Sequence, residues 1–333
     1  MGIRVAVAGA AGTIGREIVK TLAERAFPAE RVVALGSGRA VGGSLSYGEQ
    51  NLRVESLDRH ELGGTDLLFI ASGTPAAASL AGRAAAAGAL VVDTTGSAPA
   101  TPIVPEVNPG AIGAALEDRI LASPGPGAIL VAMALKPLHD LAGLTRIVAV
   151  TYQPVSSVGR AAMDELFAQT RAVYVNESPP PEEFPKPIAF NLFPQVGAFN
   201  EDGTTEEEAA LTEELEELLG APTIATCVRV PVFIGQAVAI HAAFARPIEE
   251  AEAREALREA PGLTLLDRRD DGGYITPIET AGEDPVFVSR LRRDPTVPNG
   301  LALWCAADNL RKGGALNAVQ IAEELVRRGA LAP

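Results

Sequence analysis

Short apolar runs and segments with helical periodicity alternate along the first 125 residues. The apolar runs predict four strands, at residues 4–8, 31–35, 66–71 and 89–93. The segments between them predict helices at 14–23 and 75–87. Strands separated by helices indicate a parallel sheet, because a parallel pair needs a long crossover connection. The pattern predicts a Rossmann-type α/β domain over residues 1–125.

The pattern changes after residue 126. A helix is predicted from Pro126 to about residue 140, and a proline suits the first turn because its missing N–H costs nothing there. Longer strands follow, at residues 146–155, 224–232, 237–244, 286–292 and 301–306. Two helices lie among them, at 160–175 and 205–219. We expect an α+β domain over residues 126–310. The closing segment 311–333 carries a helix at 314–327 that we expect to pack on the first domain.

Composition narrows the classes of partner. The formal net charge of −14 disfavours nucleic acids and anionic membranes, because both bind through a basic face. No apolar run reaches the ~18–20 residues that cross a bilayer, and we expect a cytoplasmic protein. Two cysteines, Cys227 and Cys305, and three scattered histidines predict neither a disulfide framework nor a metal site.

A glycine-rich turn joins the first predicted strand to the first predicted helix. It contains Gly9, Gly12, Thr13, Ile14 and Gly15 in a G-x-x-G-x-x-G spacing. Small residues let the backbone approach a pyrophosphate, which the N–H groups and the positive dipole end of the helix then hold. The context favours a dinucleotide site over a plain strand-to-helix turn.

Two further polar turns follow predicted strands of the same sheet. Ser37 and Arg39 come after the second strand, where an NAD-preferring site places an acidic residue on the ribose hydroxyls. A hydroxyl and a guanidinium suit a 2′-phosphate instead, so the sequence favours NADP as the cofactor. Ser72 and Gly73 follow the third strand, at the carboxyl edge where cofactors lie.

Motifs along nearly the whole chain resemble the aspartate-semialdehyde dehydrogenase family. Besides the glycine-rich turn, they are Val104–Pro109, Ala134–His139, Thr151–Ser156, Cys227–Val232 and Asp308–Glu323. Residues 188–192 and 195–198 are closer still to the divergent USG-1-like branch. The resemblance implies a Rossmann-type domain followed by an α+β dimerisation and substrate domain of the semialdehyde dehydrogenase type. It also implies a homodimer, and a cofactor-binding role for Asn317.

The resemblance implies reversible, NADP- and phosphate-dependent oxidation of an aldehyde to an acyl phosphate through a cysteine thioester. In the run Ser123–Ile129 the cysteine's place falls on Pro126, or on Gly125 if the loop is shifted by one residue. Neither residue can form a thioester. The family's general-base histidine stands seven residues after its substrate arginine, here Arg229, and that place holds Gln236. An amide does not titrate near neutrality and cannot act as that base.

Other positions of the implied site are kept. Gln153 lies 27 residues after Pro126 and matches a glutamine that assists positioning. Arg229 matches the arginine that grips the substrate carboxylate through a bidentate fork. Glu207 matches a substrate-binding glutamate, although Ala210 stands where the family's lysine follows it. The segment 93–99 also lacks the family's phosphate-binding arginine.

Three functions stay open. We favour an NADP(H)-binding, semialdehyde-dehydrogenase-like protein that is unable to perform acylating dehydrogenation. The second hypothesis is a reductase that transfers hydride directly to a small carboxylate-bearing carbonyl compound, without a covalent intermediate. The third is an aspartate-semialdehyde dehydrogenase that uses an atypical nucleophile, such as Cys227. All three predict a small carboxylate-bearing ligand.

Overall fold

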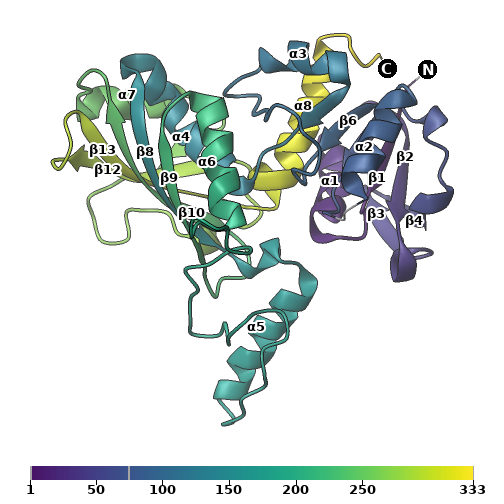
Figure 1. The fold of residues 1–333 in the computed structure, drawn as a ribbon, viewed down its shortest axis with the longest axis horizontal. Helices are drawn as coiled ribbons and strands as arrows, with labels where there is room; N and C mark the ends of the chain where they lie inside the picture. Colours follow the sequence, from purple (N-terminus) through teal and green to yellow (C-terminus); the bar gives the residue numbers. More distant parts are fainter. Residues whose placement is uncertain (1, 74–75, 333) are drawn as a thin grey trace. The chain divides into compact units, whose positions relative to one another are not determined.

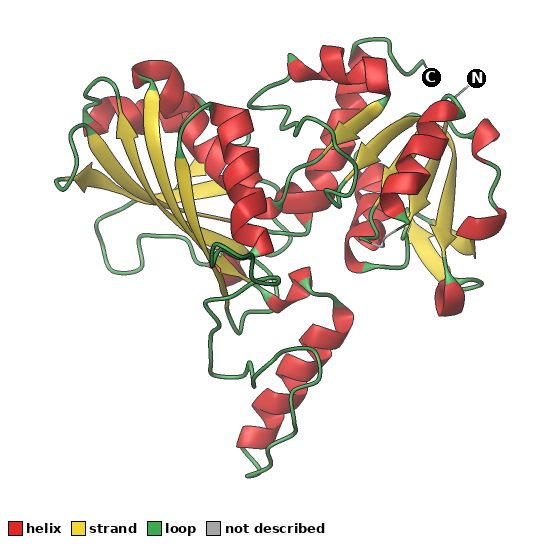
Figure 2. Cartoon of the chain, in the orientation of Figure 1, coloured by secondary structure: helices red, strands yellow, loops and turns green. Residues whose placement is uncertain are grey.

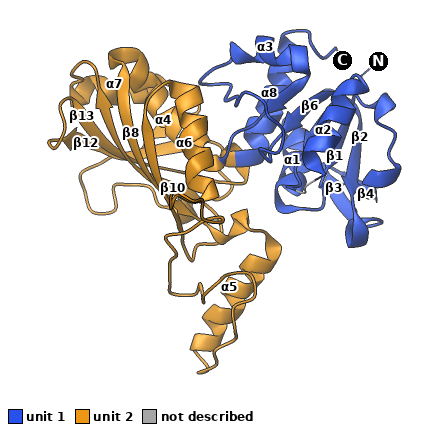
Figure 3. Cartoon of the chain, viewed as in Figure 1, with its two compact units in different colours: residues 1–125, 314–333 blue, residues 126–313 orange. Residues whose placement is uncertain are grey.

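The chain forms two compact units (Figures 1 and 3), described in a computed structural model for residues 2–73 and 76–332. Residues 1–125 and 314–333 make the first unit, and residues 126–313 make the second. We expected the last boundary at residue 310, and the contacts divide the chain after Gly313. Pro75, the expected first residue of a helix, lies outside the described residues.

The first unit is a seven-stranded sheet of order β3-β4-β2-β1-β5-β6-β7. All neighbouring strands run parallel except β3 and β4, which form a hairpin. The strands are β1 (Ile3–Ala8), β2 (Ala29–Gly36), β3 (Ser44–Tyr47), β4 (Gln50–Ser56), β5 (Leu67–Ile70), β6 (Leu90–Asp93) and β7 (Ile120–Ala122). The helices are α1 (Thr13–Glu24), α2 (Ala77–Ala86), α3 (Ala111–Asp118) and α8 (Leu316–Arg327). This arrangement confirms the Rossmann-type domain.

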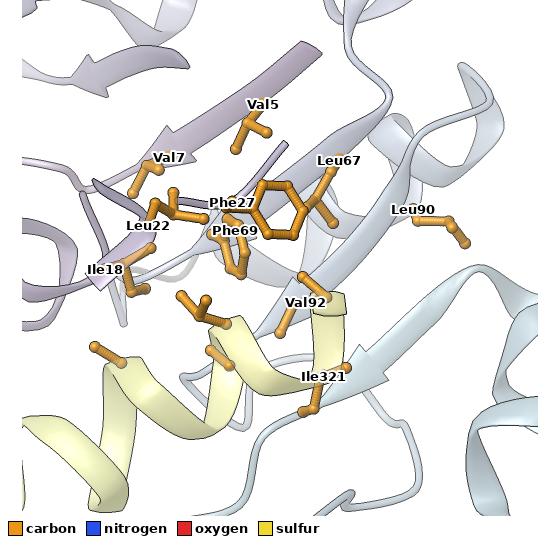
Figure 4. Close-up of a cluster of buried hydrophobic side chains, with 14 of the residues drawn as sticks. Val5, Val7, Ile18, Leu22, Phe27, Leu67, Phe69, Leu90, Val92 and Ile321 are labelled. Carbon is orange, nitrogen blue, oxygen red and sulfur yellow. The ribbon is translucent and has the colours of Figure 1, made fainter. Parts of the chain in front are cut away.

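One face of this sheet is buried under helices from both ends of the chain. Figure 4 shows Val5 of β1 and Phe69 of β5 beside Leu22 of α1 and Ile321 of α8. All four side chains are at most 1% exposed. The opposite face packs mainly on α2, through side chains such as Leu80. Burial on both faces is what a parallel sheet requires, and it accounts for the continuous apolar strands.

The second unit is a six-stranded mixed sheet of order β11-β12-β13-β10-β8-β9 (Figure 2). Its strands are β8 (Leu144–Gln153), β9 (Thr223–Arg229), β10 (Gln236–Phe244), β11 (Leu263–Leu265), β12 (Val286–Asp294) and β13 (Gly300–Ala307). Its helices are α4 (Pro126–Ala142), α5 (Arg160–Val173), α6 (Glu206–Leu219) and α7 (Glu250–Glu259). The two-domain fold class predicted from the sequence is therefore confirmed.

The two faces of the second sheet differ in burial. Alternate residues of β8, such as Ile147 and Ala149, are fully buried, and α4 packs against β8, β10, β12 and β13. The residues that alternate with these buried ones, Val148 and Val150, are only half-buried. This alternation marks a sheet with one face packed on helices and the other largely open in the single chain.

Several elements were missed by the sequence analysis: the β3–β4 hairpin, α3, β7, α7 and β11. Helix α7 is highly charged and buries only Ala253 and Leu257, which leaves little apolar periodicity to detect. Helix α8 begins two residues later than expected, because Arg311–Ala315 form a π-helical turn before it. Within residues 2–73 and 76–332, no helix is long and apolar enough to span a bilayer.

Candidate functional site

The glycine-rich turn of the first unit is so tightly packed that it requires glycine at two positions. Gly9 has φ +79°, and a Cβ there would lie 2.7 Å from Cβ of Ser72. A Cβ on Gly15 would lie 2.2 Å from the carbonyl oxygen of Gly9, far inside van der Waals contact. The turn therefore holds the start of α1 directly against the ends of β1 and β5.

The start of α1 offers donors to an anion. Gly12 precedes the helix, its N–H donates to the Gly9 carbonyl at 2.9 Å, and no side chain caps the first turn. The first N–H groups of the helix, from Thr13 to Gly15, have no acceptor within the helix. Uncapped N–H groups and a close backbone fit the pyrophosphate of a dinucleotide. A nicotinamide dinucleotide bound there would supply the hydride chemistry.

The other predicted cofactor residues lie at the same edge of the sheet, except Asn317. Ser37 and Arg39 follow β2 and are exposed, while Ser72 and Gly73 follow β5. Because β2, β1 and β5 are parallel neighbours, these turns and the glycine-rich turn share the carboxyl edge.

Asn317 is fully buried in α8 rather than placed on that edge. Its Nδ2 donates to the carbonyl of Ile103 and to Oγ of Ser123, both at 2.9 Å. These bonds fasten α8 to the segments before and after α3 and β7. These bonds give Asn317 a structural role in the first unit. That Asn317 also binds the cofactor remains a prediction.

In the second unit, three predicted residues form a row across neighbouring strands. Gln153 ends β8 directly opposite Arg229, which ends β9. Gln236 begins β10, on the other side of β8, where Ala237 pairs with Tyr152. Residues opposite each other in a sheet point to the same face, so the row faces the helices. All three side chains are at most 7% exposed.

Glu207 joins this row from the first turn of α6. Its Oε1 accepts a hydrogen bond of 2.9 Å from Nε2 of Gln153. A capping box between Thr205 and Glu208 fixes the start of the helix, and Glu208 also accepts from the Cys227 N–H at 3.0 Å. Glu207, for which the sequence showed no lysine partner, is thus held by the side-chain amide of Gln153.

Arg229 keeps part of its guanidinium for a ligand. Nη1 donates to the carbonyl of Pro154 at 2.7 Å and to Oγ of Ser157. Among the described residues, none accepts a hydrogen bond from its Nε or Nη2. Burial lowers the pKa of Arg229, and the negative charge of Glu207 opposes that shift. A positive group fixed in this way, with donors left over, is suited to a carboxylate.

Gln236 lies beside the start of α4, next to the residue that follows Pro126. Pro126 is the first residue of the helix, as expected, and Gly127 after it is buried. A Cβ on Gly127 would lie 3.3 Å from Nε2 of Gln236. Gln236 is 1% exposed, and no described residue accepts a hydrogen bond from its Nε2.

Three residues that position Gln236 were missed. Gly235 before it has φ +98°, and a Cβ there would lie 2.1 Å from the Pro277 carbonyl oxygen. Its N–H donates at 3.0 Å to Oδ1 of Asn309, whose Nδ2 donates to Oγ of Ser156 at 3.1 Å. The sequence did offer a signal for these residues: Ser156 and Asn309 are polar and lie two or three residues after the apolar strands β8 and β13.

The burial of Lys312 was also not predicted from the sequence. Its side chain is 1% exposed and lies in the π-helical turn that ends the second unit. A lysine is almost never fully buried unless it is paired. The signal in the sequence was a charged residue directly before Gly313, Gly314 and Ala315, a run of small residues that is buried.

Burial disfavours the reactive, ionised form of both thiols. Cys227 and Cys305 are both fully buried. Burial raises the pKa of the Cys227 thiol to about 12, and Glu207 and Glu208 add to the rise. Burial likewise raises the pKa of Cys305. Since the thiolate is the reactive form of cysteine, burial makes both thiols poor nucleophiles in the folded chain.

Family models match both units. The NAD binding domain of semialdehyde dehydrogenases matches residues 4–115, and their dimerisation domain matches residues 135–312. Aspartate-semialdehyde dehydrogenase of Rickettsia bellii is 40% identical over 329 residues, 97% of either chain. The chain belongs to the aspartate-semialdehyde dehydrogenase family. Its resemblance at the level of the family is therefore confirmed, together with an NAD(P)-binding domain, while the USG-1-like branch stays a prediction.

More distant members of the family share the whole length of the chain. The enzyme named aspartate-semialdehyde dehydrogenase in Aquifex aeolicus is 39% identical over 99% of either chain. The crystal structure of aspartate semialdehyde dehydrogenase II from Vibrio cholerae has a TM-score of 0.95 at 35% identity, covering 98% of this chain and 99% of that one. The whole chain, Pro126 and Gln236 included, therefore has the fold of these family members.

Proposed function

We propose that this protein binds NADP(H) and a small carboxylate-bearing ligand but does not perform acylating dehydrogenation. The observation that carries the proposal is the start of α4, where Pro126 is the first residue and Gly127 after it lies beside the uncharged amide of Gln236. Neither group can attack an aldehyde or remove a proton from a nucleophile. The two thiols of the chain are buried and their pKa is raised, which supports the absence of a replacement nucleophile.

The proposal that the protein binds NADP(H) and a carboxylate rests on residues that match the family's binding positions. Arg229 supplies a fixed cation for a carboxylate, and Gln153 with Glu207 supplies a polar wall next to it. In the first unit, the exposed Ser37 and Arg39 after β2 support NADP over NAD, because a guanidinium pairs with a 2′-phosphate. The segments at 188–192 and 195–198 support a place in the USG-1-like branch.

The proposal is tested by assaying NADP reduction with aspartate semialdehyde and phosphate at high protein concentration. We expect no phosphate-dependent turnover, and binding of NADPH detected by fluorescence in the same preparation. The assay is repeated after treatment with iodoacetamide. Turnover that alkylation abolishes would contradict the proposal and show that a thiol works in this protein; Cys227→Ala would then identify it.

A second candidate function is direct hydride transfer to a carboxylate-bearing carbonyl compound. The bond between Gln153 and Glu207 favours it, because an enzyme of that type still needs an oriented polar site beside Arg229. NADPH oxidation with a 2-oxo acid or an aldehyde, unaffected by alkylation and by phosphate, would replace the first candidate by this one.

We also propose a homodimer formed through the open face of the second sheet. Residues 135–312 match a dimerisation domain, and the half-buried Val148 and Val150 lie on the face opposite the helices. Apolar side chains on an uncovered sheet face are typical of an interface between subunits. Sedimentation velocity at micromolar concentration should give a dimer, and Val148→Glu should shift it to a monomer. A stable monomer of the native protein would refute the proposal.

A further inference from the structure

The first unit contains a hollow that shares no lining with the predicted cofactor site. The hollow has a volume of about 640 Å³, and its lining comes from β1, β2, β4 and the connections that follow β2 and β4. Arg4 and Arg31 in this lining lie near the amino ends of their strands, whereas the cofactor turns lie at the carboxyl edge. None of the described residues predicted for the cofactor lines the hollow. Pockets of this volume hold small molecules.

The hollow lies where helix α2 does not cover the sheet. Arg31 and Val33 alternate along β2 on one face, and Val33 belongs to the core cluster that packs on α2. Helix α2 contacts β5, β6 and β7, so the same face over β2 and β4 is left to loops. A parallel sheet is normally covered on both faces. The uncovered part offers an apolar wall, made by Val33 and the 42% exposed Val41.

The charge of the hollow is opposite to that of the chain. The formal net charge of the protein is −14, yet the arginines in the lining outnumber the carboxylates. The arginines are Arg4, Arg31, Arg53 and Arg59, and the carboxylates are Glu55 and Glu61. Arg4 and Arg31 pair directly across β1 and β2, where like charges repel each other. A bound anion would relieve this repulsion.

Arg4 is fixed with one amino group left over. Its Nε and Nη2 donate to the carboxylate of Asp66, at 2.9 and 2.6 Å. Its Nη1 lies beside Gly64 of the lining, where a Cβ would be 3.9 Å away. Because glycine has no side chain, this N–H edge is not covered. Arg4 is thus a positioned cation at the border of the hollow.

The other three arginines keep their donors. Nη2 of Arg31 lies 3.7 Å from the nearest carboxylate oxygen, that of Glu55, which is too far for a hydrogen bond. Within the part of the chain that the structure describes, nothing accepts a hydrogen bond from the guanidinium of Arg53 or Arg59. Gly42, with φ +88°, leaves space beside Arg53, since a Cβ there would lie 3.9 Å from Nη2. These donors are available to a ligand.

We propose that the hollow binds a small organic phosphate, whose phosphate group pairs with Arg53 and Arg59 and whose organic group lies on Val33 and Val41. A guanidinium donates two parallel hydrogen bonds to a phosphate, and a phosphate has the charge and the oxygen atoms to take two guanidinium groups. A carboxylate carries a single charge and two oxygens, and suits one arginine. The site is independent of the proposed function, because it shares no residue with the cofactor turns or with Arg229.

The test titrates the protein with phenyl phosphate, inorganic phosphate and phenol. NADPH is present at saturation, so that the cofactor site stays filled, and ligand-detected NMR gives the dissociation constants. We expect phenyl phosphate to bind the native protein at least about threefold more tightly than inorganic phosphate, because only the ester carries an apolar ring. Phenol, which has the ring without the charge, should bind at least about tenfold more weakly than phenyl phosphate.

Two double variants locate the binding. In Arg53→Gln/Arg59→Gln the affinity for phenyl phosphate should fall at least about fivefold. The melting temperature should not change, because neither side chain has a partner to lose. Arg83→Gln/Lys186→Gln removes the same charge from exposed side chains outside the hollow. This control should keep the native affinity within about twofold.

The inference would be overturned by the native protein alone if phenyl phosphate did not bind, or if it bound no more tightly than inorganic phosphate or phenol. An unchanged affinity in Arg53→Gln/Arg59→Gln would also overturn it. Equal losses in the two double variants would mean that the ligand responds to net charge and not to this hollow. Turnover of aspartate semialdehyde plays no part in these measurements, so failure of the proposed function is distinguishable from failure of this inference.

Discussion

Gly15→Ala should destabilise the first unit and weaken the binding of NADPH together. The new Cβ would lie 2.2 Å from the Gly9 carbonyl oxygen and 2.7 Å from Cα of Ala10. Both are backbone atoms, so α1 must move away from the turn. We expect a loss of about 3 kcal/mol in the free energy of unfolding. This corresponds to a melting temperature lower by roughly 6–12 °C for a domain of this size. Thermal denaturation and fluorescence titration with NADPH measure the two effects.

The matched control is Gly82→Ala in α2 of the same unit. A Cβ at this position meets nothing within 4 Å, and the residue lies inside a helix. Alanine favours a helix over glycine, so this variant should gain about 0.5–1 kcal/mol and bind NADPH normally. If Gly15→Ala melted like the native protein and bound NADPH with the same affinity, the tight turn would not be what shapes the cofactor site.

Arg229→Met should abolish most of the affinity for a carboxylate ligand. Arg229 is 7% exposed and fixed by Pro154 and Ser157, so the cation is already in place before a ligand arrives. Removing one member of a buried ion pair costs about 2–5 kcal/mol. We therefore expect binding of L-aspartate at least about 30-fold weaker. Calorimetric titration measures the change, and circular dichroism verifies the fold.

The control for this variant is Arg160→Met at the start of α5. The Arg160 side chain is 82% exposed and pairs only with Asp164 on the helix surface. An exposed pair of this kind contributes little, so the binding of L-aspartate should be unchanged. Equal losses in Arg229→Met and Arg160→Met would mean that the ligand responds to the net charge of the protein. A normal affinity in Arg229→Met would remove Arg229 from the ligand site.

The fold could be predicted from the sequence wherever burial leaves a strong pattern. Strand β1 and helix α1 are buried on the sides that the apolar residues of 4–8 and 14–23 indicated. Helix α7 and the hairpin of β3 and β4 were not predicted, because they bury few residues and so show little apolar periodicity. They lie largely at the surface, so few of their positions need to be apolar, and most of their residues are polar or charged.

The candidate site could be predicted only in its residue types. Gln153 and Arg229 lie far apart in the sequence, and only the parallel register of β8 and β9 brings them side by side. A shift of one residue in that register would turn one of them to the other face. That Gln153 donates to Glu207, and that Nε2 of Gln236 has no acceptor among the residues that the structure describes, depend on atoms from several elements. No local pattern in the sequence carries that information.

The position of α8 has a consequence for the order in which the protein is made. Ile321 and Leu325 of this last helix belong to the same buried cluster as Val5 and Phe69. A ribosome delivers the strands of this cluster first and the helix that covers them last. The part of this sheet face that α8 covers therefore stays exposed until nearly the whole second unit has been synthesised.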